Sequence, residues 1–204
     1  MKKSAYKRAL CALFSVFLAL TMVFPGEVAL AASAPGNVAR FSMSGCSAST
    51  VSLSWSKVKG ASGYRIRRYD SKSKKWKTVL TATKGSAIKG TVKKLSPATT
   101  YKLQIHAYKK AGKKTLYSKK AKTLTVATKP AKVTLLSVKA SGAKITVSWK
   151  KVAASGFQVI YARNKQFKNG ESVLVGGSNK AATYYAPYSG TYYVHLRPYK
   201  NLNG

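Results

Sequence analysis

The chain has 204 residues, and nearly all of its charge has one sign: 38 Lys and Arg against three Asp and Glu, for a formal net charge of +35. This composition excludes general acid–base and glycosidase chemistry of the usual kind, because such chemistry needs paired carboxylates. The same charge creates a field that attracts polyanions and that salt screens over about 8–10 Å.

The first 31 residues have the pattern of a secretory signal peptide. Four basic residues precede an apolar run from Ala9 to Phe24, Pro25-Gly26 follows, and small side chains end the segment at Ala31. The run of about 16 residues is shorter than the roughly 20 needed to cross hydrocarbon, so we expect no transmembrane segment after cleavage. We place cleavage after Ala31, with Ala34 as the alternative. The rest of the chain is then secreted or held at the cell surface, with a charge of about +32.

Residues 34–129 predict a first domain made only of strands. Short runs rich in Val, Ile, Thr and Tyr alternate with polar residues and are bounded by Gly, Ser, Lys and Pro, and no stretch has a helical stripe. The expected strands are 38–43, 50–56, 63–69, 76–82, 87–92, 99–109 and 115–126. Seven short strands with frequent turns indicate a β-sandwich.

Alternation along the sixth strand assigns side chains to its two faces. One face is expected in the core and the other in solvent. The core set is Tyr101, Leu103, Ile105 and Ala107, and the solvent set is Lys102, Gln104, His106 and Tyr108. Cys46 lies in a Ser/Gly/Ala stretch that predicts a small filler in a loop. It is the only cysteine after the signal peptide, so no intramolecular disulfide forms.

The domain is repeated once. Trp55 and Trp149 are 94 residues apart, Tyr101 and Tyr192 are 91 apart, and each lies in a matching neighbourhood. A period near 90 residues is a whole-domain repeat. We therefore expect a stiff linker over residues 127–131 and an incomplete second domain over 131–204, which stops before its seventh strand. We interpret this as truncation of a longer protein, and the alternative is that an edge strand is missing and its neighbour is exposed. In its final strand, Tyr192, Val194 and Leu196 are expected inside, and Tyr193, His195, Arg197 and Tyr199 outside.

Several of these residues resemble a fibronectin type III domain. Trp55 ends the second strand, Gly63-Tyr64-Arg65-Ile66 opens the third, and the segment from Leu95 to Tyr101 precedes the sixth. The resemblance implies two immunoglobulin-like β-sandwiches in tandem and a tyrosine corner made by Tyr101. The core residues that it implies are Trp55, Tyr64, Leu95 and Tyr101 in the first copy and Trp149, Phe157 and Tyr192 in the second. Ala186 replaces Leu95 in the second copy, so we expect Tyr185 or Tyr188 to supply the lost packing.

No residue pattern predicts catalysis, a metal or a cofactor. Asp70 and Glu171, the only acidic residues after the signal peptide, lie in different copies and are interpreted as turn residues. Zinc needs three or four converging ligands, whereas Cys46, His106 and His195 are scattered and both histidines are expected in solvent. No nucleophile elbow, phosphate loop or dinucleotide motif occurs. As far as this chain runs, we expect no enzyme activity.

The candidate site is a basic face on the sheet that holds the third, fourth, sixth and seventh strands. It would bind polyanions through Arg65, Arg67, Lys102, Lys109, Lys110, Lys113 and Lys114, with Tyr69, Trp76 and Tyr108 between them. Most of these charges are lysines, which attract without the bidentate fork that reads a base edge. Anionic cell-wall or host polysaccharide, or another carbohydrate, is therefore favoured over sequence-specific nucleic acid. The alternative is that the lysines only keep the surface polar.

These observations leave two functions of different classes. The first is an exported, non-catalytic surface or extracellular protein that resembles those of Gram-positive bacteria and acts as a spacer or adhesive module. The second is an accessory module of a secreted carbohydrate- or peptidoglycan-hydrolysing enzyme whose catalytic domain lies beyond Gly204. Neither reading names the ligand, the oligomeric state or the means of surface retention.

Overall fold

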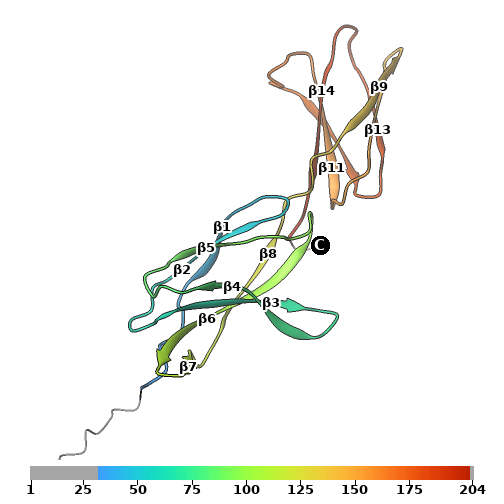
Figure 1. Cartoon of the computed structure of the whole chain (residues 1–204). Helices are drawn as coiled ribbons and strands as arrows, with labels where there is room; N and C mark the ends of the chain where they lie inside the picture. The colour runs from blue at the N-terminus through green and yellow to red at the C-terminus, as the bar shows by residue number, and fades with distance from the viewer. Residues whose placement is uncertain (1–31, 203–204) are drawn as a thin grey trace, which may run out of the picture. The chain divides into compact units, whose positions relative to one another are not determined.

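The computed structural model describes residues 32–202, which form 14 strands and no helix. The predicted signal peptide lies outside the described residues. Within them there is no helix long and apolar enough to cross a membrane. The expected all-β architecture of two sandwiches in tandem is confirmed (Figure 1).

The first sandwich has two antiparallel sheets. One sheet has the order β1-β2-β5, and the other has the order β4-β3-β6-β7, with β8 also pairing with β6. The strands of the first sheet are β1 (Phe41–Cys46), β2 (Val51–Trp55) and β5 (Lys89–Val92). Those of the second are β3 (Gly63–Asp70), β4 (Lys75–Ala82), β6 (Thr100–Ala111), β7 (Lys114–Tyr117) and β8 (Lys122–Ala127).

The predicted seventh strand, 115–126, is two strands. Both β7 and β8 pair with β6, and the chain leaves the sheet between them at Ser118. Ser118 is 3% exposed, and its N–H donates to the Ala107 carbonyl at 2.9 Å. The Lys120 N–H donates to Asn37 Oδ1 at 2.9 Å, so the break is held by hydrogen bonds from outside the strand.

The second sandwich has six strands in the described residues. One sheet has the order β13-β10-β9 and the other β12-β11-β14, all antiparallel. The first sheet contains β9 (Leu135–Ser141), β10 (Lys144–Trp149) and β13 (Ala181–Tyr185). The second contains β11 (Gly156–Ala162), β12 (Glu171–Gly176) and β14 (Tyr193–Tyr199).

Residues in three hairpin turns suit the backbone conformation of those turns. The turns between β6 and β7 and between β9 and β10 contain Gly112 and Gly142, with φ of 56° and 57°. Glycine adopts this left-handed conformation at little cost because it has no Cβ. At Asp70, the Oδ1 atom accepts the N–H groups of Lys72 and Ser73, which stabilises the turn after β3.

Each sandwich buries its own core between its two sheets. Trp55 is 5% exposed and its indole N–H donates to the Ala87 carbonyl at 2.9 Å, whereas Trp149 is 1% exposed and its Nε1 has no partner in the described protein. The remaining core candidates are Tyr64 and Phe157, both 0% exposed, Leu95, 6% exposed, and Tyr101 and Tyr192, both half-buried against a core. The apolar face of β2 in the first sandwich, and that of β10 in the second, thus pack against the opposite sheet of the same sandwich.

The tyrosine corners of the two copies differ in detail. In the first, the Ser96 N–H donates to Tyr101 Oη at 2.7 Å, and in the second, Tyr192 Oη donates to the Tyr188 carbonyl at 3.3 Å. The expectation that Tyr185 or Tyr188 replaces Leu95 is wrong. Both rings point to solvent, at 68% and 67% exposed.

A different tyrosine pair fills the second core. Tyr161 and Tyr184 are buried and stack with ring centroids 4.5 Å apart and an interplanar angle of 15°. Burial raises the pKa of Tyr161 to about 12, and the nearby Tyr184 adds to the rise. These residues come from β11 and β13, so the stack joins the two sheets.

Candidate polyanion-binding face

The predicted basic face is the outer surface of the β4-β3-β6-β7 sheet. On β3, Arg65 lies opposite His106 and Arg67 lies opposite Gln104, so these side chains project from the same side of the sheet. Their inward neighbours Tyr64 and Ile66 are fully buried in the core. The alternation that buries one set of side chains therefore directs both arginines outward.

Both arginines are partly covered by other side chains. The Arg65 guanidinium lies 4.7 Å from the centre of the Tyr117 ring, a cation–π contact, and its Nε is buried without a protein partner. Arg67 Nε and Nη2 each lie 3.0 Å from the Gln104 side-chain oxygen, in the amide orientation that satisfies both groups. Arg65, Arg67, His106 and Tyr117 line a cavity of about 60 Å³. The arginines thus help to cover the sheet as well as to charge it.

The prediction that the outer face of β6 points to solvent is wrong for three residues. Gln104 and Tyr108 are 7% and 4% exposed, and His106 is half-buried. His106 Nδ1 lies 3.1 Å from the Ser118 carbonyl. Desolvation is the main effect and lowers the pKa of His106. The hydrogen bond with the Ser118 carbonyl raises this pKa by less, and the positive charge of Arg67 lowers it by the smallest amount.

The lysines of the candidate site are separate from the arginines. Lys102 is exposed on β6, opposite Thr125 of β8. The other four lie at the hairpin between β6 and β7, where Lys110, Lys113 and Lys114 are exposed and Lys109 is half-buried. The structure thus divides the predicted site into a partly covered arginine pair, one isolated lysine and a cluster of hairpin lysines.

The predicted aromatic residues also separate. Tyr69 and Trp76 form an edge-to-face pair, with centroids 5.3 Å apart, at the end of β3 and β4. Tyr108 is instead buried beside Tyr117, at 6.1 Å. Sequence reasoning missed Tyr117 as a partner of Arg65. Alternation along the seventh strand could have assigned Tyr117 to a face of the sheet, but the register that places it opposite Tyr108 is seen only in the structure.

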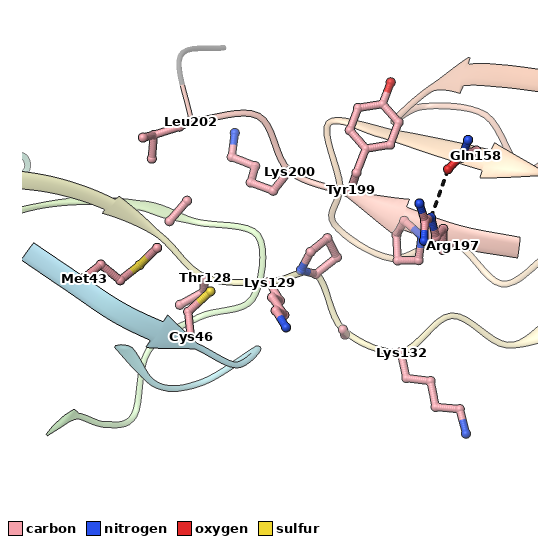
Figure 2. Close-up of a pocket in the computed structure, with 14 residues that line it drawn as sticks. Met43, Cys46, Thr128, Lys129, Lys132, Gln158, Arg197, Tyr199, Lys200 and Leu202 are labelled. Atoms are coloured by element: carbon pink, nitrogen blue, oxygen red, sulfur yellow. Dashed lines mark hydrogen bonds between the residues drawn. The ribbon is translucent and has the colours of Figure 1, made fainter. Parts of the chain in front are cut away.

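In the second sandwich, the outer face of β14 carries a shorter basic stripe. His195 and Arg197 are exposed, and Tyr193 and Tyr199 are half-buried. Figure 2 shows Arg197 beside Gln158, whose Oε1 accepts the Arg197 Nε–H at 2.9 Å. This cross-strand pair links β14 to β11.

The acidic residues do not form a pair. Asp70 makes an ion pair with Lys77 across β3 and β4. The hydrogen bond from Lys77 is the largest of the effects that lower the pKa of Asp70 to about 2, and the N–H of Ser73 adds to it. Glu171 lies in the other sandwich near Tyr184, whose pKa is raised first by burial and then by this carboxylate. Residues 32–202 contain no group of three His, Cys, Asp or Glu side chains that could hold a metal ion.

Cys46 ends β1 and does not lie in a loop. Its thiol is free, half-buried, and packs against the first core.

Comparison with known proteins gives a family match within the first sandwich. The sequence model of the fibronectin type III domain matches residues 33–123, which confirms the resemblance for that segment. Among solved structures, the chain is similar to a segment of two fibronectin type III domains from chicken tenascin, with 20% identity and a TM-score of 0.49 over 83% of this chain and 93% of that one. It is also similar to a crystal structure of FN3tt, with 21% identity and a TM-score of 0.39 over 48% of this chain and 98% of that one. A comparison with curated proteins gives no match.

Proposed function

We propose that this protein is an exported, non-catalytic module that holds to anionic polymers of a cell wall or extracellular matrix, and that its two sandwiches act as spacer and adhesive platform. Export is proposed from the pattern of residues 1–31. A fibronectin type III domain supplies a stable sandwich, and the surface charge supplies the attraction.

The observation that carries this proposal is charge without counter-charge. The sequence has 38 basic and three acidic residues, and among residues 32–202 Lys77–Asp70 is the only ion pair. Solubility alone is met by surfaces of mixed sign. Because few of its cations have an anionic partner within the protein, this surface favours the binding of anionic ligands.

The hairpin lysines are the favoured contact. Lys110, Lys113 and Lys114 are exposed and close in sequence, whereas Arg65 and Arg67 are engaged with Tyr117 and Gln104. Lysine ammonium groups attract phosphate, sulfate and carboxylate without demanding one geometry. Binding should therefore follow the charge density of the polymer and fall steeply with salt.

The test is binding of residues 32–204 to wall teichoic acid, heparin and a neutral glycan across about 50–500 mM salt. A variant with Lys109, Lys110, Lys113 and Lys114 all changed to Ser should bind the two anionic polymers at least about tenfold more weakly at low salt. A matched control changes four exposed lysines elsewhere in the first sandwich, Lys57, Lys59, Lys84 and Lys89, to Ser.

The two variants lose the same charge, so they separate a local site from total charge. If both variants bound the anionic polymers equally weakly, total charge and not the hairpin lysines would account for the binding. Absence of binding by the unchanged protein at low salt would refute the adhesive function.

A further inference from the structure

The small cavity on the outer face of the β4-β3-β6-β7 sheet brings two cations together. Arg65 and Arg67 come from β3, His106 from β6 and Tyr117 from β7. The cavity volume of about 60 Å³ is larger than the roughly 10–15 Å³ that one buried water needs. All four side chains are half-buried. A small ligand in this space would therefore contact protein on several sides.

The Nε–H group of Arg65 needs an acceptor. Tyr117 covers the face of the guanidinium, with 4.7 Å between the guanidinium carbon and the ring centre. The N–H groups of a guanidinium lie in its plane, so this cation–π contact does not satisfy them. Among residues 32–202, Arg65 Nε is buried without a hydrogen-bond partner. Leaving a buried donor of a charged group unpaired is costly, which favours an acceptor from outside the protein.

Arg67 has donors left for the same acceptor. Its Nε and Nη2 each lie 3.0 Å from the Gln104 side-chain oxygen, in the amide orientation given above. A guanidinium has five N–H donors, so the contact with Gln104 uses two and leaves three. These donors form a rigid fork that matches the oxygen atoms of phosphate, sulfate or carboxylate.

The first sandwich supplies no carboxylate to this pair. Asp70 is the only acidic residue in residues 32–131, and it forms an ion pair with Lys77. Arg67 lies close enough to His106 for its positive charge to lower the pKa of that histidine. Two partly buried guanidinium groups without a counter-ion are better satisfied by an anion than by water.

We propose that Arg65 and Arg67 form a binding site for one phosphate or sulfate group, either a free ion or a monoester. Oxygen atoms of the group accept the Arg65 Nε–H and the remaining N–H donors of Arg67, and Tyr117 forms one wall. A tetrahedral oxyanion presents acceptors in several directions, so it can pair with both guanidinium groups at once. The site is separate from the hairpin lysines and does not depend on their binding a polymer.

The ring of His106 reports whether the site is occupied. Its Nδ1 lies 3.1 Å from the Ser118 carbonyl, which can only accept, so Nδ1 carries a proton. The other ionisable groups that line the cavity are Arg65 and Arg67 of β3 and Tyr117 of β7. An anion bound to Arg67 offsets a charge that lowers the pKa of His106, so this pKa should rise when the site fills.

The test is titration of residues 32–204 with sodium phosphate, sodium sulfate and glycerol phosphate in about 150 mM NaCl, which screens the surface lysines. NMR follows the ring signals of the two histidines. Those of His106 should shift and saturate at one ligand per chain, and its pKa should rise. Those of His195 are the reference for non-specific binding. Similar affinities for inorganic and glycerol phosphate would support a site for monoesters, and binding of inorganic phosphate alone would support a site for the free ion.

Two arginine variants that lose the same charge provide a matched comparison. Arg65→Gln should weaken phosphate binding at least about tenfold. Arg68 is on the same strand and also packs on a tyrosine, 5.4 Å from the Tyr101 ring centre, but it lies opposite the buried Leu103 and not on the outer face. Arg68→Gln should therefore change the affinity by less than about twofold.

Arg65→Lys separates geometry from charge. It keeps the positive charge and an apolar stem over the sheet, but it has neither Nε–H nor the fork of donors. Phosphate binding should still fall about fivefold or more. This variant tests the site even if Arg65→Gln lowers the stability of the sandwich.

Three results would overturn the inference. The first is no saturable shift of the His106 signals at about 50 mM phosphate. The second is equal effects of Arg65→Gln and Arg68→Gln. The third is a parallel shift of His106 and His195, which would leave only diffuse attraction. The variant without the four hairpin lysines should keep phosphate binding at this site while its polymer binding falls, so failure of either proposal is recognised separately.

Discussion

The hydroxyl of Tyr64 is a sensitive point in the first core. Tyr64 is fully buried, its Oη accepts the Val58 N–H at 2.8 Å and donates to the Gly85 carbonyl at 3.3 Å. The second sandwich has Phe157 at the equivalent place, also fully buried. The ring alone therefore packs well, and Tyr64→Phe removes the hydroxyl without a large change in volume.

The expected cost follows from the group left behind. Val58 is 8% exposed, and its hydrogen bond to Tyr64 is buried, so the substitution leaves a donor without a partner. Such a loss costs about 1–3 kcal/mol of unfolding free energy. For a domain of this size, that is a fall of about 5–15 °C in the midpoint of thermal unfolding.

Scanning calorimetry of residues 32–204 measures this fall, and the transition of the second sandwich serves as internal reference. Tyr108→Phe is the matched control, because Tyr108 is also buried but its hydroxyl makes only a 3.4 Å bond to the Ala82 carbonyl. Its cost should stay at about 1 kcal/mol or less. If Tyr64→Phe were no more destabilising than Tyr108→Phe, the argument from the orphaned Val58 N–H would be refuted.

Two further substitutions test the packing and the titration of the cores. Gly63→Ala should destabilise the first sandwich by about 2–3 kcal/mol in denaturant melts, because the added Cβ meets the Ala82 carbonyl and would lie 2.5 Å from Tyr108 Oη. Gly45→Ala is the control, since the space around its Cβ is open, and it should cost under about 0.5 kcal/mol in the same measurement. Tyr161 has a pKa raised to about 12 and a hydroxyl without a protein partner among the described residues, so the unfolded chain releases its proton first. Unfolding free energy of the second sandwich should therefore be constant below about pH 10 and fall between about pH 10 and 12, and Tyr161→Phe should reduce that fall. A pH profile unchanged by the substitution would contradict this assignment.

The β-sandwich architecture was predictable because its main determinants are local. Alternation along Val51–Trp55 and Gly156–Ala162 directs every second side chain to the core, and the spacing of Trp55 and Trp149 shows that the same domain occurs twice. Strand positions follow from such patterns because a period of two is a property of the strand itself.

The exposure of side chains on the outer faces of the sheets depended on residues that are distant in sequence. Alternation places His106 and Gln104 on the outer side of β6, but it cannot show that this side is covered. The cover comes from Arg67 of β3, and beside it Arg65 packs on Tyr117 of β7. Those neighbours become adjacent only when the sheet assembles, so the arginines of the predicted site also complete the surface of the fold.

The aromatic packing of the second core was decided in the same way. Tyr185 and Tyr188 are close in sequence to Ala186, yet they point to solvent, whereas the stack that joins the two sheets pairs Tyr184 with Tyr161 of another strand. Periodicity determines which side of a strand a residue occupies. Only the packing of one sheet on the other determines which side chains meet there, because that choice depends on the volume that residues from both sheets leave to be filled.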